Sequence, residues 1–218
     1  MLAITILLFS FCFPSQAAQK PPADIVQKLL PNPNNPSSVV LPKPAERADD
    51  IKLLKEAQRD ASGFRAQQLS FVLAALNVDY ERNRDYLIWV LRGCDVPEIK
   101  NGCDENTGQY LVYLLQHGHR DVLAPLLDAA TKDYNAVASE GLGSFFAGFA
   151  ANSPDDFLAA VRSFPVAGQK RACSFAGSGD GGGMALEDLK KVRAHWGTMN
   201  DEVAQRCLRA IEGANKVQ

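Results

Sequence analysis

One stretch of the sequence, Gly177 to Gly183, has a composition that could hold a ligand. Its glycines let consecutive backbone N–H groups turn toward one point, and a helix beginning near Met184 would add the positive potential of its N-terminus. Together these features could seat an anion or a carboxylate. The candidate binding residues for a ligand or a protein partner are Gly179, Asp180, Gly181, Gly182 and Gly183.

The same stretch has a simpler interpretation as a tight connector between two helices. The G-x-G-x-x-G spacing of Gly177, Gly179 and Gly182 occurs in dinucleotide-binding loops, but those loops follow a strand of a parallel sheet, which this sequence does not predict. Asp180 alone falls far short of the roughly six to eight oxygen ligands that calcium takes. The connector and the binding turn both remain open, and neither a cofactor nor a metal is expected.

Cysteine usage points to an oxidising compartment. Cys12 lies in an N-terminal apolar run, and the four cysteines that follow it are an even number, which favours disulfide bonds in an exported chain. Four cysteines permit three pairings, of which we favour Cys94 with Cys103 and Cys173 with Cys207. A zinc site is the competing interpretation, but no C-x2-C pair is present to build one. Oxidised pairs would also leave no reactive thiol.

The other residues with catalytic potential have structural explanations. His117 and His119 flank Gly118, which is typical of a helix end, so the two imidazoles would share no fixed face for a metal. The acidic pairs at 49–50 and 155–156 fall in first helical turns, where the helix dipole favours negative charge. The sequence contains no H-E-x-x-H, G-x-S-x-G or S-x-x-K motif. We therefore identify no catalytic residue.

Helices must position these residues, because apolar side chains recur every three to four residues and alternating strand patterns are scarce. The chain is expected to be mostly α-helical, with short connections that make neighbouring helices antiparallel. The predicted helices span residues 46–61, 64–77, 80–92, 107–117, 121–131, 134–150, 154–164, 167–175, 184–196 and 199–213.

Gly141, Gly143 and Gly148 interrupt the aromatic-rich helix predicted at 134–150. They either allow close packing of helices or break the helix, so that it restarts with Ser144 as an N-cap. Core packing is the favoured interpretation, and an exposed aromatic partner site is the alternative.

A faint repeat runs through the helical region. Similar apolar segments begin at Asp85, Asp121 and Asp156, so their starts lie 36 and 35 residues apart, and a lysine-rich fourth copy begins at Asp188. This is the size of the helical hairpin in α-solenoids, although aspartate is also selected independently at helix starts. We expect an all-α fold: an array of short antiparallel helical hairpins, either α-solenoid-like or an irregular helical bundle, held by two disulfides.

The N-terminal region divides into a leader and a spacer. Residues 2–13 are mostly apolar, but they are fewer than the roughly 20 residues that a membrane-spanning helix needs. Ser15-Gln16-Ala17 follows, with small residues at the positions that signal peptidase recognises, so cleavage is expected after Ala17. Residues 1–17 are therefore predicted to be a signal peptide. Residues 18–45 are rich in proline, which predicts a disordered spacer, although 24–30 has helical spacing that could dock. The helical domain then spans residues 46–218.

The composition agrees with an exported protein that is soluble after cleavage. The chain has 218 residues, of which 46% are hydrophobic and 22% charged, and its net charge is −2, as in ordinary globular proteins. Without a basic cluster, neither nucleic acid nor an anionic membrane is expected as partner. We expect a periplasmic or secreted binding or interaction module for a protein or extracellular ligand. The less favoured alternative is an enzyme, a secreted hydrolase that acts on cell-wall or extracellular polymer through carboxylates.

Overall fold

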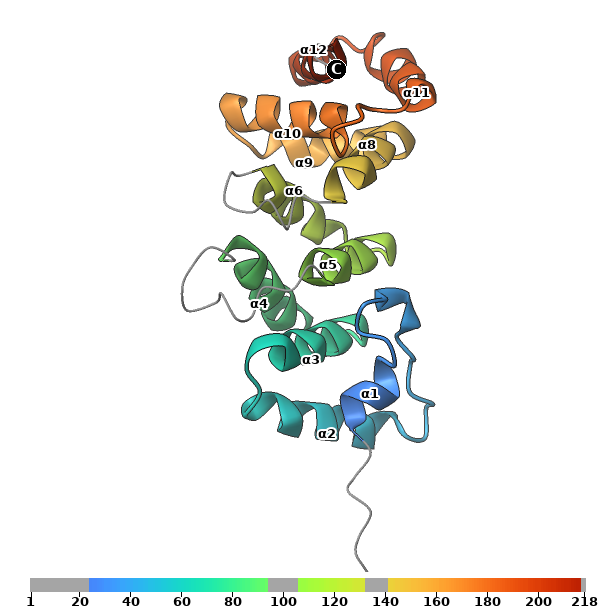
Figure 1. Cartoon of the computed structure of the whole chain (residues 1–218), viewed down its shortest axis with the longest axis vertical. Helices are drawn as coiled ribbons and strands as arrows, with labels where there is room; N and C mark the ends of the chain where they lie inside the picture. The colour runs from blue at the N-terminus through green and yellow to red at the C-terminus, as the bar shows by residue number, and fades with distance from the viewer. Residues whose placement is uncertain (1–23, 94–105, 132–140, 217–218) are drawn as a thin grey trace, which may run out of the picture.

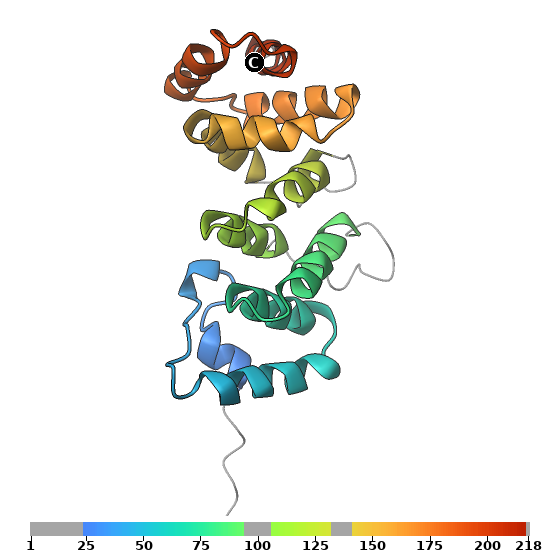
Figure 2. The same cartoon turned by 180° about the vertical axis from the view of Figure 1, so that it is seen from behind.

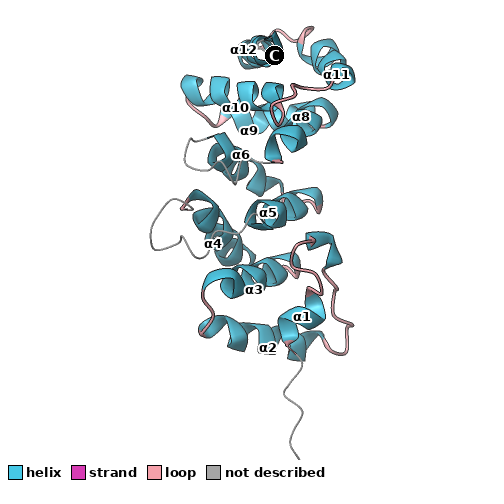
Figure 3. Ribbon diagram, viewed as in Figure 1, coloured by secondary structure: helices cyan, strands magenta, loops and turns pink. Residues whose placement is uncertain are grey.

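The fold is built from helices over the part of the chain that can be described. A computed structural model describes residues 24–93, 106–131 and 141–216, and these residues contain α-helices and short 3-10 turns but no strand (Figures 1 and 3). The prediction of an all-α fold is confirmed. The leader at 1–17, residues 18–23 of the predicted spacer, and both Cys94 and Cys103 lie outside the described residues.

The helices follow one another along the long axis of the molecule, from the N-terminal helices at one end to the C-terminal helices at the other (Figures 1 and 2). Most of them begin and end within a few residues of the predicted bounds. They are α1 Ile25–Leu29, η1 Pro36–Ser38, α2 Arg47–Arg59, α3 Gly63–Ala75, α4 Tyr80–Arg92, α5 Asn106–Gln116, η2 Arg120–Val122, α6 Leu123–Thr131, α8 Leu142–Asn152, α9 Pro154–Arg162, α10 Val166–Ser178, α11 Leu186–Trp196 and α12 Glu202–Lys216.

Local sequence signals set several helix ends. Ser153 precedes Pro154 at the first position of α9, where a proline loses no helical hydrogen bond, and Gly93 follows the last residue of α4. Asp79 stands immediately before α4 as predicted, but its side chain does not cap the helix. Its backbone is left-handed, with a φ of 44°, and its carboxylate instead binds Nζ of Lys55 at 2.8 Å.

The core is continuous from layer to layer and contains large aromatic side chains from successive helices. Phe71 of α3 stacks on Tyr110 of α5 with 4.4 Å between ring centroids, and Phe157 of α9 stacks on Trp196 of α11 at 5.9 Å. All four side chains are fully buried. In both pairs the partners lie 39 residues apart in the sequence, so each contact joins one layer of helices to a later one.

Ion pairs repeat nearly the same separation. Asp121 and Asp156 occupy corresponding places, because each binds an arginine of an earlier helical element, whereas Asp85 pairs with its own neighbour Arg84. Three pairs between different helical elements join residues that lie 36 or 37 positions apart in the sequence. They are Arg84 with Asp121, Arg92 with Asp128 at 3.2 Å, and Arg120 with Asp156 at 3.4 Å.

The prediction of a disordered spacer is wrong for residues 24–45, which pack against the helical domain. α1 buries its isoleucine, valine and leucine in the core, and further along the hydroxyl of Tyr110 donates a hydrogen bond to the carbonyl of Pro33 at 3.0 Å. The helically spaced apolar residues bury surface that offsets the loss of chain entropy. The prolines bring no N–H group that would need a partner.

The C-terminal helices depart from the expected antiparallel hairpins. Cys173 of α10 is bonded to Cys207 of α12, and one turn further Gly177 meets Ile211. The contacts advance in the same direction along both helices, so α10 and α12 are parallel, and α11 returns the chain from one to the other (Figure 1). Short direct connections enforce antiparallel neighbours, but an intervening helix removes that constraint.

Candidate functional site

The glycine-rich stretch begins inside a helix. α10 runs to Ser178, beyond the predicted end at residue 175, so Gly177 is helical and buried. A Cβ atom placed on Gly177 would lie 2.7 Å from the Cα of Ile211 in α12, which is closer than atoms pack. Glycine at this position therefore allows the backbones of α10 and α12 to touch.

The turn after α10 uses its own backbone donors. The N–H groups of Gly181 and Gly183 donate to the carbonyl of Ser178 at 3.1 and 2.8 Å, and the N–H of Met184 donates to the carbonyl of Gly177 at 2.9 Å. Positive φ angles at three of its glycines make this tight turn possible. Three amides that a bound anion would need are thus engaged within the turn.

The same turn packs against the start of α8. A Cβ atom on Gly143 would lie 2.1 Å from the carbonyl oxygen of Gly179 and 2.8 Å from Oδ1 of Asp180, so this glycine provides the close approach that the sequence favoured. The carboxylate of Asp180 therefore lies by the N-terminal end of α8, where the helix dipole favours negative charge. α8 begins at Leu142, and the alternative restart at Ser144 does not occur.

The five candidate residues are therefore arranged as a connector. Gly179 is buried, Gly183 is half-buried, and Asp180, Gly181 and Gly182 are exposed at its tip. The turn supplies its own carboxylate to a helix end, and this geometry favours the connector interpretation over the anion seat.

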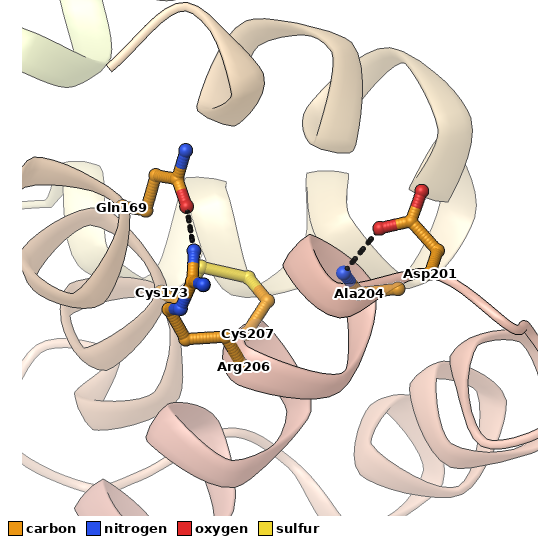
Figure 4. The surroundings of a disulfide bond; sticks show 6 residues. All are labelled: Gln169, Cys173, Asp201, Ala204, Arg206 and Cys207. Atoms are coloured by element: carbon orange, nitrogen blue, oxygen red, sulfur yellow. Dashed lines mark hydrogen bonds between the residues drawn. A yellow bond between two sulfur atoms is a disulfide. The ribbon is translucent and has the colours of Figure 1, made fainter. Parts of the chain in front are cut away.

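The predicted disulfide between Cys173 and Cys207 is present (Figure 4). It joins α10 to α12, and beside it Arg206 of α12 donates a hydrogen bond to the side-chain carbonyl of Gln169 of α10. Both cysteines are only 1% exposed, so thiols in solution have little access to the sulfur atoms. The bond serves as a link between two helices.

The histidines of the turn at 117–119 have partners of their own. Nδ1 of His117 lies 2.8 Å from the carbonyl of Tyr113 in the preceding helix α5, and the ring of His119 stacks on Tyr80 at 4.2 Å. In the described segments of the chain, no group of three or more His, Cys, Asp or Glu side chains is arranged to hold a metal ion.

A cluster of tyrosine, arginine and aspartate joins α4 to η2. The hydroxyl of Tyr80 donates to Asp121 at 2.9 Å, and Arg84 donates to the same carboxylate. Burial raises the pKa of Asp121, but the hydrogen bonds from Arg84 and Tyr80 outweigh it and lower this pKa below its usual value. Burial and the neighbouring carboxylate raise the pKa of Tyr80. A carboxylate with a lowered pKa is a weak base and is poorly suited to accept a proton from a substrate. We therefore interpret the cluster as a structural link between α4 and η2.

A cleft of about 160 Å³ lies between α2, α3 and α4. Its lining combines small apolar, amide and aromatic side chains with one charged residue. The lining residues are Gln58, Ala61, Ala66, Ser70, Arg82, Asn83 and Tyr86.

Hydrogen bonds fix the polar floor of this cleft. The side-chain amide of Gln58 donates to the hydroxyl of Ser70 at 3.0 Å and to Oδ1 of Asn83 at 2.7 Å. The amide of Asn83 donates in turn to the carbonyls of Val78 and Asp79 at 3.0 and 3.1 Å. Ser70 and Asn83 are 2% and 1% exposed. Every side-chain amide N–H of the floor is therefore occupied within the protein.

One face of α4 forms the rim. Arg82, Tyr86 and Trp89 follow one another at intervals of four and three residues, which places them in one row along the helix. The rings of Tyr86 and Trp89 lie 5.9 Å apart, and Trp89 is 57% exposed. Burial raises the pKa of the Tyr86 hydroxyl, which keeps this side chain neutral. Arg82 is exposed and has no ion pair within the described residues.

The sequence does not reveal the cleft, because three helices build it and none of them shows it alone. One signal was available: in the predicted helix 80–92, Trp89 falls on the row of Arg82 and Tyr86 and away from the apolar face of Leu87, Val90 and Leu91. A tryptophan on the polar side of an amphipathic helix indicates a contact surface.

Comparison with known proteins assigns no family. The chain has no significant match among protein-family models, curated proteins or solved structures. None of the helices that the structure describes has the length and apolar character needed to cross a bilayer. The functional interpretation therefore depends on the helix array and the cleft.

Proposed function

We propose that the chain is an exported helical-repeat protein that binds a partner through the cleft between α2, α3 and α4. The array is supported by contacts that recur at 36 to 39 residues, as in Arg120 with Asp156 and Phe157 with Trp196. In α-solenoids each unit contacts its neighbours in this way, and the stack presents an extended surface for binding. We therefore interpret the array as solenoid-like, with a parallel helix pair at its C-terminal end.

The row of Arg82, Tyr86 and Trp89 beside the cleft is the observation that carries the proposal. Arginine, tyrosine and tryptophan are the residues that contribute most to binding at protein interfaces. The tryptophan leaves more than half of its surface in water although the core has room for rings such as Trp196, which is fully buried. A bound partner would remove this apolar surface from water.

Export is proposed from the leader at 1–17 together with the disulfide of α10 and α12, because structural disulfides persist in oxidising compartments. The hydrolase alternative receives no support from this cleft. Arg82 is the only charged residue among the described residues that line it, and polymer hydrolysis by paired carboxylates would need acidic side chains there.

Tryptophan fluorescence tests the proposal directly, because the chain has two tryptophans and Trp196 is fully buried. Quenching by iodide therefore reports on Trp89. We expect full-length protein to bind members of immobilised peptide and oligosaccharide arrays, and the bound probe to protect Trp89 from iodide. Trp89→Ala should lose the binding, whereas Leu186→Ala, which removes an exposed side chain from α11, should retain it. Retention of a probe with equal affinity by the Trp89→Ala variant would refute the assignment of the cleft.

A further inference from the structure

We infer that the cleft binds an acidic peptide segment, with a carboxylate on Arg82 and a neighbouring apolar side chain inserted against Ala61, Ala66 and Tyr86. This inference rests on the proposed binding function and names the chemistry of its ligand. It follows from the charge of the cleft, from the state of its floor and from its size.

The charge of the lining is positive. Arg82 is the only ionised side chain among the lining residues that the structure describes, and no described carboxylate pairs with it. The contrast with the same helix is informative, because Arg84 and Arg92 of α4 both hold aspartates of the next layer. A guanidinium offers paired N–H donors that match a carboxylate. A ligand that gives Arg82 the carboxylate partner that Arg84 and Arg92 already have must therefore carry an acidic group.

The floor favours an apolar side chain over a sugar. Both amide N–H groups of Gln58 and both of Asn83 are already used inside the protein. Hydroxyl groups of a sugar pushed into the cleft would lose water and find few donors in exchange, which is costly. Ala61, Ala66 and the ring of Tyr86 offer apolar contact to a side chain without that cost.

The size of the cleft favours an anchor rather than a whole ligand. Pockets for free small molecules usually measure about 300 to 1,000 Å³, and this cleft measures about 160 Å³. That space suits one aliphatic or aromatic side chain of a longer chain that continues over the surface. Trp89, one turn further along α4, then covers the next part of the peptide.

The experiment uses fluorescein-labelled decapeptides with a central leucine flanked by glutamates, and the same peptides with glutamines. Fluorescence anisotropy with the full chain should show binding of the glutamate series that is at least tenfold tighter than that of the glutamine series, as loss of a charged hydrogen bond predicts. Amidated and free C-termini separate a side-chain carboxylate from a terminal one. Iodide quenching of Trp89 should fall in parallel.

Substitutions test whether Arg82 is the residue that binds the carboxylate of the peptide. Arg82→Gln should weaken binding of the glutamate series about tenfold, and Arg82→Lys should restore part of it because a single ammonium replaces the guanidinium. Arg209→Gln, an exposed arginine of α12 without a partner in the described residues, is the matched control and should change nothing.

The possible failures are distinguishable. If the protein binds both peptide series equally, or binds only oligosaccharides in the arrays, the acidic-peptide inference is wrong while the binding function stands. If Arg82→Gln and Arg209→Gln have equal effects, general charge and not Arg82 attracts the peptide, and the inference is overturned. If no peptide and no oligosaccharide binds, the proposed function itself fails.

Discussion

Lys28 of α1 holds the buried carboxylate of Asp50 in α2, with Nζ at 2.8 and 2.9 Å from its two oxygens. Among the described residues, Asp50 is the only buried residue that carries a charge, at 4% exposure. Nζ of Lys28 also binds Glu46 at 2.9 Å. The N-terminal segment is therefore fastened to the array by charge as well as by the apolar face of α1, and this attachment can be tested by substitution and by pH.

Replacement of Lys28 by methionine should lower the urea midpoint of unfolding, because it leaves the Asp50 carboxylate buried without a partner. The double variant Lys28→Met/Asp50→Leu should recover part of the loss, since it removes the unpaired charge as well. Equilibrium unfolding followed by circular dichroism measures both. Equal midpoints for wild type and Lys28→Met would show that the pair does not fasten the segment.

The contacts of Lys28 predict that both acid and alkali weaken this attachment. Hydrogen bonds to Asp50 and Glu46 raise the pKa of Lys28 above 10.5, and the hydrogen bond from Lys28 lowers the pKa of Glu46 below 4.5. The lysine contribution is therefore complete below pH 10.5 and is lost above it, and the glutamate contribution is complete above pH 4.5 and is lost as acid protonates it. In Lys28→Met, the free energy of unfolding should therefore depend less on pH than in the wild type, at both the acid and the alkaline end of a series from pH 3 to 12.

Gly177→Ala should destabilise the protein by about 1 to 3 kcal/mol, as overpacking of a core does. Its new Cβ atom would lie 2.7 Å from the backbone of Ile211, which no side-chain rotation relieves. Gly213→Ala in α12 is the matched control: nothing lies within 4 Å of its Cβ position, so it should stabilise the helix by up to about 1 kcal/mol. Thermal and urea unfolding of both variants check the difference in sign. A neutral Gly177→Ala would contradict the close contact of α10 with α12.

Loss of the disulfide should destabilise the same pair of helices. The Cys173→Ala/Cys207→Ala variant is expected to lose about 2 to 4 kcal/mol of unfolding free energy, because the bond joins two positions 34 residues apart and closes a loop in the unfolded chain. Non-reducing peptide mapping should recover the bonded pair, and free thiols at both positions would refute it.

The sequence could predict the helices better than the site, for physical reasons. Helix 80–92 shows its apolar face through Leu87, Val90 and Leu91, so its bounds agree with α4. The close helix contact at Gly177 could not be predicted from the sequence, because it depends on the backbone of Ile211, which lies 34 residues further along the chain.

The docking of residues 24–45 and the cleft are also tertiary properties. α1 is too short to be stable alone and becomes ordered through contacts with the rest of the array. The cleft arises where the side-chain amides of Gln58 and Asn83 meet, and the sequence around either residue does not show that α2 and α4 bring them together. The fold class was thus predictable from periodicity, while the candidate site depended on which helices pack together.

Asp121→Asn tests whether the ion pairs between hairpins hold the array in register. Burial opposes ionisation of Asp121, but the hydrogen bonds from Arg84 and Tyr80 lower its pKa below 3.8, so its contribution is present above that pH and is lost as pH falls through the lowered pKa. We expect Asp121→Asn to cost about 1 kcal/mol, the upper end for a partly exposed pair, and to weaken the acid dependence of stability.

Asp85→Asn is the control for this prediction, because in the described part of the chain Asp85 pairs with its helix neighbour Arg84 and with no residue of a second layer. It should change the unfolding free energy less than Asp121→Asn does. Hydrogen exchange gives the structural readout: amides of α4, and of η2 with the α6 helix that follows it, should exchange faster in Asp121→Asn, since η2 would then lose its ion pair with α4. A link between two layers must affect the helices on both sides of their interface. Equal losses of unfolding free energy and equal amide exchange rates in the two variants would therefore mean that the recurring ion pairs are surface contacts that do not stabilise the stacking of the helices.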